Sequence, residues 1–158
     1  MTTTRRPLPV PGSPPTVRYR GRARAVLVQI VRGACPSDVD ELGITEELVA
    51  FVEDTLAYAP RYLAPALKLG LLALDAASVL DGGGTALSKM TPERARAYVE
   101  ASGHGPNVPR TAVIPQVRLL ARMGYFEHPL VHARMRYDAA AWIVKVKKER
   151  LVRHADDL

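Results

Sequence analysis

The chain has 158 residues, of which 47% are hydrophobic and 24% charged, so it is long enough for one hydrophobic core and too short for two ordinary domains. Its single cysteine cannot form an internal disulfide, and the composition argues against a disordered chain, a collagen, a disulfide scaffold and a transmembrane protein. Aromatic residues make up 6% of the chain, whereas alanine and leucine are abundant, which favours helices over sheet. We predict an all-α fold, a compact bundle of five or six helices with an extended N-terminal arm rich in proline and arginine.

The net charge of +6 is distributed unevenly along the chain. Residues 1–24 contain six arginines and no acidic residue, which equals the whole excess of positive charge. The remainder is neutral, with a mildly acidic middle and a second basic stretch over residues 134–153. A basic arm attracts any polyanion or acidic partner, so the charge by itself does not identify the ligand.

The first 15 residues hold five of the 13 prolines, a density that prevents a helix and favours extended, polyproline-like conformations. Arg5 and Arg6 are followed by these prolines instead of the apolar stretch that an export signal needs, so we expect a cytoplasmic protein. We divide the chain into a basic arm (1–21), a helical domain (22–144) and a basic helix end or tail (145–158).

Three helices are expected before residue 81. Residues 22–35 carry a short apolar run that fits either a helix or a buried strand, and we assign a helix. After a polar turn, Thr45 is the expected N-cap of a second helix that ends at about Ala59, before Pro60. The third helix runs from Arg61 to about Leu80.

This third helix is apolar on nearly every side. Its expected core face has helical spacing, and comprises Leu63, Ala66, Leu67, Gly70, Leu71, Leu74, Ala77 and Ser78. Other apolar residues, including Leu69, Leu72 and Leu80, lie elsewhere around the helix. A membrane span is disfavoured because Arg61, Lys68 and Asp75 would be costly in a bilayer. Two interpretations remain: a central helix surrounded by its own neighbours, which is the default, or a helix whose second face another polypeptide covers.

The glycines at 82–84 are expected to end this helix, with glycine in the left-handed conformation. Thr91 is the expected N-cap of a fourth helix that has Pro92 in its first turn and ends near Ala101. A fifth helix is expected from about Arg110 to Met123, with Pro115 in its first turn and Gly124 as its end. Residues 145–153 read as the solvated end of a further helix.

The polar residues form no catalytic or metal-binding constellation in the sequence. His128 and His132 are four residues apart, as metal-binding pairs are, but no third ligand stands at a recognised spacing. His104 lies in a glycine loop without a fixed nucleophile, and Cys35 beside Pro36 is expected to be a small buried residue. We therefore predict no catalytic, cofactor-binding or metal-binding residue on this chain, and an accessory subunit in place of an enzyme.

Three segments resemble a known family: Tyr62-Leu63-Ala64-Pro65-Ala66-Leu67-Lys68-Leu69-Gly70-Leu71-Leu72-Ala73-Leu74-Asp75, the turn at 87–94 with Thr91-Pro92-Glu93-Arg94, and Val117-Arg118-Leu119-Leu120 leading to Gly124-Tyr125-Phe126-Glu127-His128-Pro129. They are similar to the small subunit, subunit 3, of gluconate 2-dehydrogenase-type enzymes. The resemblance covers about residues 48–143.

The resemblance implies a non-catalytic helical partner of a large glucose-methanol-choline flavoprotein, in which FAD and the catalytic histidine belong to the other chain. The substrate of such a complex would be an alcohol, a sugar or a sterol-like hydroxyl compound. The sequence departs from the family because it lacks an export signal and a haem-attachment Cys-x-x-Cys-His motif. These differences weaken the expectation of a periplasmic location and of electron transfer by this chain.

We expect the interface with this flavoprotein to include two arginines of the arm and a set of apolar residues. They are Arg18, Arg20, Leu69, Leu72, Tyr125, Phe126 and Trp142. The alternative function is a small basic nucleic-acid-binding protein that uses Arg18 to Arg24 and Lys145 to Arg153. The acidic middle and the absence of a basic recognition helix in the sequence disfavour it. A stand-alone enzyme that uses His104 or His128 is the third possibility.

Overall fold

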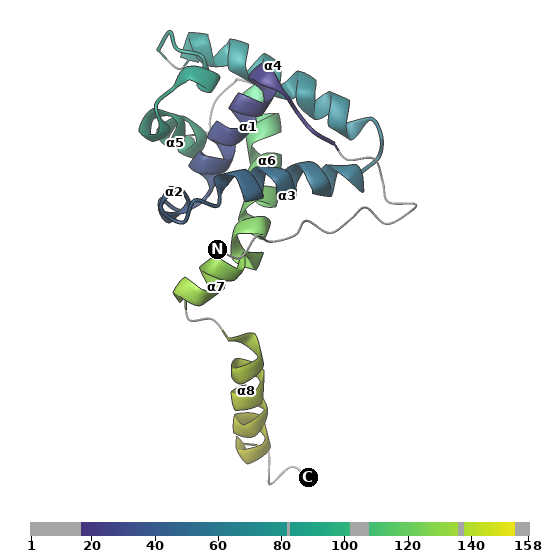
Figure 1. Cartoon of the computed structure of the whole chain (residues 1–158), viewed down its shortest axis with the longest axis vertical. Helices are drawn as coiled ribbons and strands as arrows, with labels where there is room; N and C mark the ends of the chain where they lie inside the picture. Colours follow the sequence, from purple (N-terminus) through teal and green to yellow (C-terminus); the bar gives the residue numbers. More distant parts are fainter. Residues whose placement is uncertain (1–16, 82, 102–107, 136–137, 154–158) are drawn as a thin grey trace, which may run out of the picture. The chain divides into compact units, whose positions relative to one another are not determined.

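The computed structural model describes residues 17–81, 83–101, 108–135 and 138–153, and every regular element in these ranges is helical (Figure 1). The elements are α1 (Gly21–Ala34), α2 (Asp38–Glu41), α3 (Thr45–Ala57), α4 (Leu63–Asp81), η1 (Leu87–Lys89), α5 (Pro92–Glu100), α6 (Val108–Glu127), α7 (Pro129–Met135) and α8 (Ala139–Arg153). The predicted all-α class is confirmed, with eight α-helices in the described ranges where five or six were predicted. Residues 1–16 of the predicted arm lie outside these ranges.

The chain divides into two compact units between Gly124 and Tyr125. The first unit contains α1 to α5, η1 and most of α6, and the second contains the last residues of α6 together with α7 and α8. At the segment boundaries expected from the sequence, 21/22 and 144/145, the chain is helical: α1 begins at Gly21 and α8 runs through residue 144.

Helix α1 forms the centre of the first unit. Its buried apolar residues recur at helical spacing, and they are Ala23, Val26, Leu27, Ile30, Val31 and Ala34. Helices α3, α4 and α5 and the η1 turn all pack against it (Figure 1). The helical assignment of residues 22–35 is therefore confirmed, and an apolar stripe flanked by arginines becomes the core of the unit.

Two predicted helix-end signals are found in the structure. The Thr91 side chain caps α5 by accepting a hydrogen bond from the backbone N–H of Arg94 at 3.4 Å, and Pro92 begins the helix. After α4, Gly83 and Gly84 take positive φ angles of 68° and 80°, which glycine adopts without steric cost. The N–H of Gly84 donates to the carbonyl of Val79 at 2.9 Å and closes the end of the helix.

The prediction that Gly124 ends the fifth helix is wrong, because α6 continues to Glu127. Gly124 serves a close contact between helices instead: a Cβ at this position would lie 2.7 Å from Cδ1 of Phe51 on α3. Pro115 also lies in the interior of α6 and not in its first turn, since the helix begins at Val108.

The predicted N-cap role of Thr45 is also wrong. Ile44 occupies the N-cap position of α3, and Thr45 is its first helical residue. The Thr45 hydroxyl instead donates to Asp40 Oδ1 at 3.2 Å, which ties the start of α3 to the short helix α2. The polar turn predicted between Pro36 and Gly43 thus contains a helical turn of its own.

Candidate protein-binding site on helix α4

Helix α4 has two opposite apolar faces, of which one is buried. Its buried residues are Leu71, Leu74, Asp75 and Ser78. On the other side, exposed residues follow one another at alternating spacings of four and three along the helix: Tyr62, Ala66, Leu69, Ala73, Ala76 and Leu80. At 100° per residue these six positions lie within about 40° of one line, opposite the buried residues. We call these six residues the α4 stripe.

The stripe exposes large apolar side chains almost completely. Tyr62 is 70% exposed, Leu69 is 69% exposed and Leu80 is 89% exposed. Tyr62 precedes α4 but belongs to the same helical register, because its carbonyl accepts a hydrogen bond from the N–H of Ala66 at 3.1 Å. Tyr58, in the connection between α3 and α4, is 80% exposed. Alternating spacings of four and three on an apolar helix are typical of a seam that packs against another polypeptide segment.

Polar contacts on the buried face fix which side of α4 is turned outward. Asp75 accepts hydrogen bonds from the Ser88 N–H at 2.7 Å and the Ser88 hydroxyl at 3.0 Å, and it forms an ion pair with Arg22 of α1. The Ser78 hydroxyl accepts a hydrogen bond from the Leu87 N–H at 2.7 Å. Rotating α4 would break these buried contacts, so the stripe is held at the surface.

The default interpretation of this helix as a central one is therefore wrong. Leu71, Leu74 and Ser78 of the expected core face are buried, but Leu63 and Ala66 of that set are exposed. The alternating spacing of the stripe is visible in the sequence and could have revealed this second face. It could also have revealed Tyr62, which the expected set of interface residues omits.

Helix α4 is also long and apolar enough to cross a membrane, by length and composition, with a mean hydropathy of 1.6. Its buried carboxylate, Asp75, is bound within the first unit by Arg22 and Ser88. These contacts would have to be broken for α4 to enter a bilayer, and the exposed Lys68 would add a further cost.

The predicted interface residues occupy different environments. Leu69 is exposed and Leu72 is half-buried, both on α4. In the second unit, Phe126 is 52% exposed and Trp142 is 60% exposed, whereas Tyr125 is 4% exposed and offers little surface to a partner. The Tyr125 and Phe126 rings pack in a T-shaped arrangement with ring centroids 5.2 Å apart.

Arg18 and Arg20, the predicted interface arginines, lie just before α1. Arg20 is exposed, whereas Arg18 contacts Asp54 Oδ1 at 2.6 Å and Glu53 Oε2 at 3.7 Å. Arg24 also contacts Glu53, at 3.1 Å. The arginines at 18, 22 and 24 thus neutralise carboxylates of α3 and α4, of which Glu53 and Asp75 are fully buried.

Four further arginines donate to carbonyls at helix ends. Arg96 and Arg122 donate to the carbonyls of Cys35 and Ala34 at the end of α1, at 2.6 Å and 2.9 Å. At the end of α5, Arg110 and Arg118 donate to the carbonyls of Tyr98 and Val99. Because the last carbonyls of a helix lack intrahelical donors, these guanidinium groups satisfy them and complement the helix dipole. Much of the positive charge of the first unit is therefore engaged in contacts that stabilise the unit itself.

The candidate polar residues serve structural contacts. Cys35 is buried, its thiol lies 3.7 Å from the carbonyl of Ala121, and burial raises the pKa of Cys35 to about 11. His128 Nδ1 accepts a hydrogen bond from the N–H of Leu130 at the start of α7, and His132 Nε2 donates to the carbonyl of Phe126. Within the described ranges no three histidine, cysteine or acidic side chains gather as a metal site would require. His104 lies outside those ranges.

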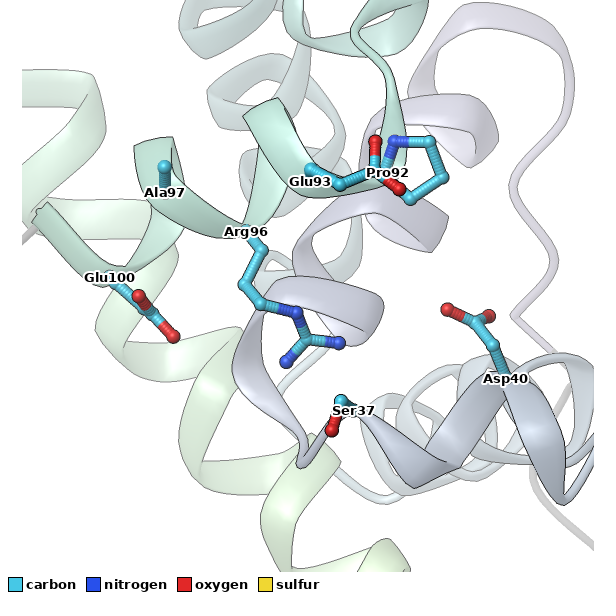
Figure 2. A pocket seen from close by; sticks show the side chains of 7 residues that line it. All are labelled: Ser37, Asp40, Pro92, Glu93, Arg96, Ala97 and Glu100. Carbon is cyan, nitrogen blue, oxygen red and sulfur yellow. The ribbon is translucent and has the colours of Figure 1, made fainter.

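A shallow pocket of about 330 Å³ lies between α5 and the start of α2. It is lined by Ser37, Asp40, Pro92, Glu93, Arg96, Ala97 and Glu100 (Figure 2). Arg96 extends from α5 toward Ser37 and holds the carbonyl of Cys35, while Asp40 pairs with Arg32 at 3.0 Å. Arg96 and Asp40, two charged side chains of this pocket, are thus already engaged in contacts within the protein.

No family model matches this chain, and neither the curated proteins nor the solved structures contain a match to it.

Proposed function

We propose that this chain is a cytoplasmic accessory subunit that binds and stabilises a larger polypeptide through the α4 stripe. The observation that supports this proposal is the exposure of Tyr62, Leu69 and Leu80 on one line of a helix whose opposite face is already buried. A contiguous exposed apolar surface of this kind is typical of a protein interaction site. Bulky side chains separated by alanines also leave space into which a partner's side chains can pack.

The resemblance of residues 48–143 to subunit 3 of gluconate 2-dehydrogenase-type enzymes suggests the partner. It would be a large flavoprotein of the glucose-methanol-choline class that carries FAD and oxidises an alcohol, a sugar or a sterol-like compound. This chain would supply no catalytic group. The exposed Phe126 and Trp142 of the second unit would add to the interface, as aromatic anchors commonly do.

Coexpression with a glucose-methanol-choline flavoprotein from the same genome tests this function. We expect the large chain to become more soluble and more fully loaded with FAD, and to copurify with this subunit as a yellow complex. Leu69→Glu should abolish copurification because it places a charge in the stripe. Leu119→Glu, at an apolar α6 residue that is 60% exposed, is the matched control and should leave the complex intact.

The proposal is wrong if the large chain is equally soluble, flavinated and active alone. It also fails if Leu69→Glu and Leu119→Glu affect the complex alike, because the stripe would then have no special role.

Nucleic-acid binding is the second candidate, and one observation favours it. Lys145, Lys147 and Lys148 are all exposed on α8, with Glu149 the nearest acidic residue along the helix. Binding to duplex DNA that weakens steeply with salt, and that Lys147→Glu/Lys148→Glu abolishes, would support this function. The positive charge available to a nucleic acid near α1 is smaller than the sequence suggests. Each of Arg18, Arg22 and Arg24 is paired with a carboxylate of the same chain.

A further inference from the structure

Helix α8 buries none of its described side chains, at positions 141–149. Local contacts support it instead. The carboxylate of Asp138 accepts a hydrogen bond from the N–H of Ala141 at 2.9 Å at the start of the helix, and Lys145 pairs with Glu149 at 3.9 Å. A helix of 15 residues is marginal in water by itself, so α8 would gain stability from any surface that covers its apolar residues.

The side chains of α8 separate into an apolar side and a basic side. Trp142 and Ile143 are exposed, and Val146, one turn after Trp142, is half-buried. At 100° per residue these three residues lie within an arc of about 100° around the helix. We call them the α8 apolar face. Lys145 and Lys147 lie just beyond the two edges of this arc, and both are exposed.

The two flanking lysines suit a helix that lies in the surface of a bilayer. A lysine side chain can follow an apolar surface with its methylene groups and place its ammonium group at the level of the lipid phosphates. With the α8 apolar face turned toward the acyl chains, Lys145 and Lys147 would reach headgroups on either side of the helix. The indole ring of Trp142, which is apolar apart from its N–H, is typical of this depth.

The charge of α8 favours an anionic surface. Residues 139–153 contain five basic residues and one acidic residue, Glu149, which pairs with Lys145. Each basic residue near a bilayer adds to the attraction of anionic lipids. A nucleic acid would also attract the lysines, but its phosphate backbone would leave the α8 apolar face in water. An apolar groove of a protein would cover that face without using the lysines on both of its edges. An anionic bilayer uses both features.

We propose that α8 binds the surface of a bilayer that contains anionic phospholipid, and lies in the plane of the interface with its apolar face against the acyl chains. The negatively charged cytoplasmic leaflet is the surface that a cytoplasmic protein would meet. This inference goes beyond the proposed function. It assigns Trp142 to the lipid, whereas the α4 stripe and Phe126 remain available to the large subunit.

Trp142 is the only tryptophan of the chain, so its fluorescence reports on α8 alone. The full-length chain is titrated with vesicles of phosphatidylcholine and phosphatidylserine in roughly equal amounts, and with vesicles of phosphatidylcholine alone. On the mixed vesicles we expect the emission of Trp142 to shift to shorter wavelength, and lipids brominated in their acyl chains to quench it. The affinity for phosphatidylcholine alone should be at least about tenfold lower, and salt should weaken binding to the mixed vesicles.

Two substitutions at adjacent positions test the orientation of the helix. Ile143 belongs to the α8 apolar face and is 48% exposed, whereas Val144 lies outside that face and is 54% exposed. Ile143→Asp and Val144→Asp add the same charge to the same turn, so both suffer repulsion from anionic lipid. We expect Ile143→Asp to bind the mixed vesicles at least about tenfold more weakly than Val144→Asp, because only Ile143 contacts the acyl chains. Circular dichroism confirms that both variants retain their helices.

The proposal is overturned if the two variants bind the mixed vesicles alike, if phosphatidylcholine alone binds as tightly, or if brominated lipids do not quench Trp142. It is also overturned if the chain binds duplex DNA but not the mixed vesicles. Loss of vesicle binding in Leu69→Glu would overturn it as well, since α4 would then be the helix in contact with lipid. Copurification with the flavoprotein is a separate result, because that complex should depend on Leu69 and not on Ile143.

Discussion

Helices α1 and α4 show how little the hydropathy of a helix determines its burial. α4 is the more apolar of the two, yet only four of its 19 residues are buried, whereas α1 buries eight of 14 although it carries Arg22, Arg24 and Arg32. The difference lies in their neighbours: α1 is enclosed by α3, α4, α5 and η1, but α4 packs on one side only. An apolar helix at the edge of a unit therefore indicates surface that is available to another segment.

The largest expected difference between the two helices is in the free energy of unfolding that is lost when one leucine on each helix is replaced by alanine. Leu27→Ala on α1 removes a fully buried side chain and should lower the free energy of unfolding by about 3 kcal/mol. Leu69→Ala on α4 removes an exposed side chain and should change the free energy by less than about 0.5 kcal/mol. Urea denaturation followed by circular dichroism measures both values.

Similar losses of unfolding free energy in the two variants would contradict the conclusion that α1 is buried and the α4 stripe is exposed. A large loss for Leu69→Ala would show that its side chain is already covered in the free protein.

The second prediction concerns the polar anchor of the buried face of α4. Asp75→Ala leaves the N–H of Ser88 without its acceptor and Arg22 without its ion pair, and should cost about 2 kcal/mol of unfolding free energy. Asp54→Ala is the control: its side chain is 51% exposed and pairs with Arg18 at the surface, so its loss should cost less than about 1 kcal/mol. Equal effects would mean that Asp75 does not fix the orientation of α4.

Sequence patterns located the helices well because apolar spacing, prolines and caps act locally. The Thr91-Pro92 start of α5 and the helical spacing in α1 are examples. Patterns that depend on a distant residue were misread. Gly124 has the sequence properties of a helix end, but the reason for glycine there is Phe51, which lies 73 positions away in the sequence and meets it only after α3 and α6 pack.

Gly124→Ala tests this explanation. In an isolated helix the change would be stabilising by up to about 1 kcal/mol, since alanine is the better helix former. In this protein the new Cβ would meet the Phe51 ring at 2.7 Å, and we expect a net loss of about 1 kcal/mol. The same change in a Phe51→Ala background should be neutral or stabilising. A loss of equal size in both backgrounds would refute the packing explanation.

The candidate site was predictable in part. The surplus of apolar surface on residues 61–80 is evident from composition, and Leu69 belongs to the stripe that the structure exposes. The helical spacing predicted Leu71, Leu74 and Ser78 on the buried face, but it could not show that the opposite face would stay exposed, because that depends on which elements pack against α4. Arg18, just before α1, and Arg22, in its first turn, suggested an outward-facing basic arm because their carboxylate partners on α3 and α4 are distant in the sequence.

The smallest expected effect concerns Cys35, which follows the last residue of α1 and is as well buried as the helix itself. Burial raises the pKa of Cys35 from 9.0 to about 11, an effect that Arg122 and Arg96 partly oppose. The folded state therefore holds the thiol proton more tightly than the unfolded state. This contribution to stability is complete below pH 9 and is lost as the pH rises toward 11, by about 1 kcal/mol at pH 10.

Cys35→Ala removes this dependence, so the unfolding free energy of the wild type should fall more steeply than that of the variant between pH 9 and 11. Tyr19 titrates alike in both proteins and cancels in the difference. The rate of reaction with a thiol reagent provides a kinetic test. At pH 7.5 Cys35 should react at least about 100-fold more slowly than a cysteine introduced as Leu80→Cys on α4. The reason is that the thiolate is the reactive form, and burial disfavours it at Cys35. Equal rates would mean that the end of α1 opens as readily as the surface of α4 and would remove the contrast between the two helices.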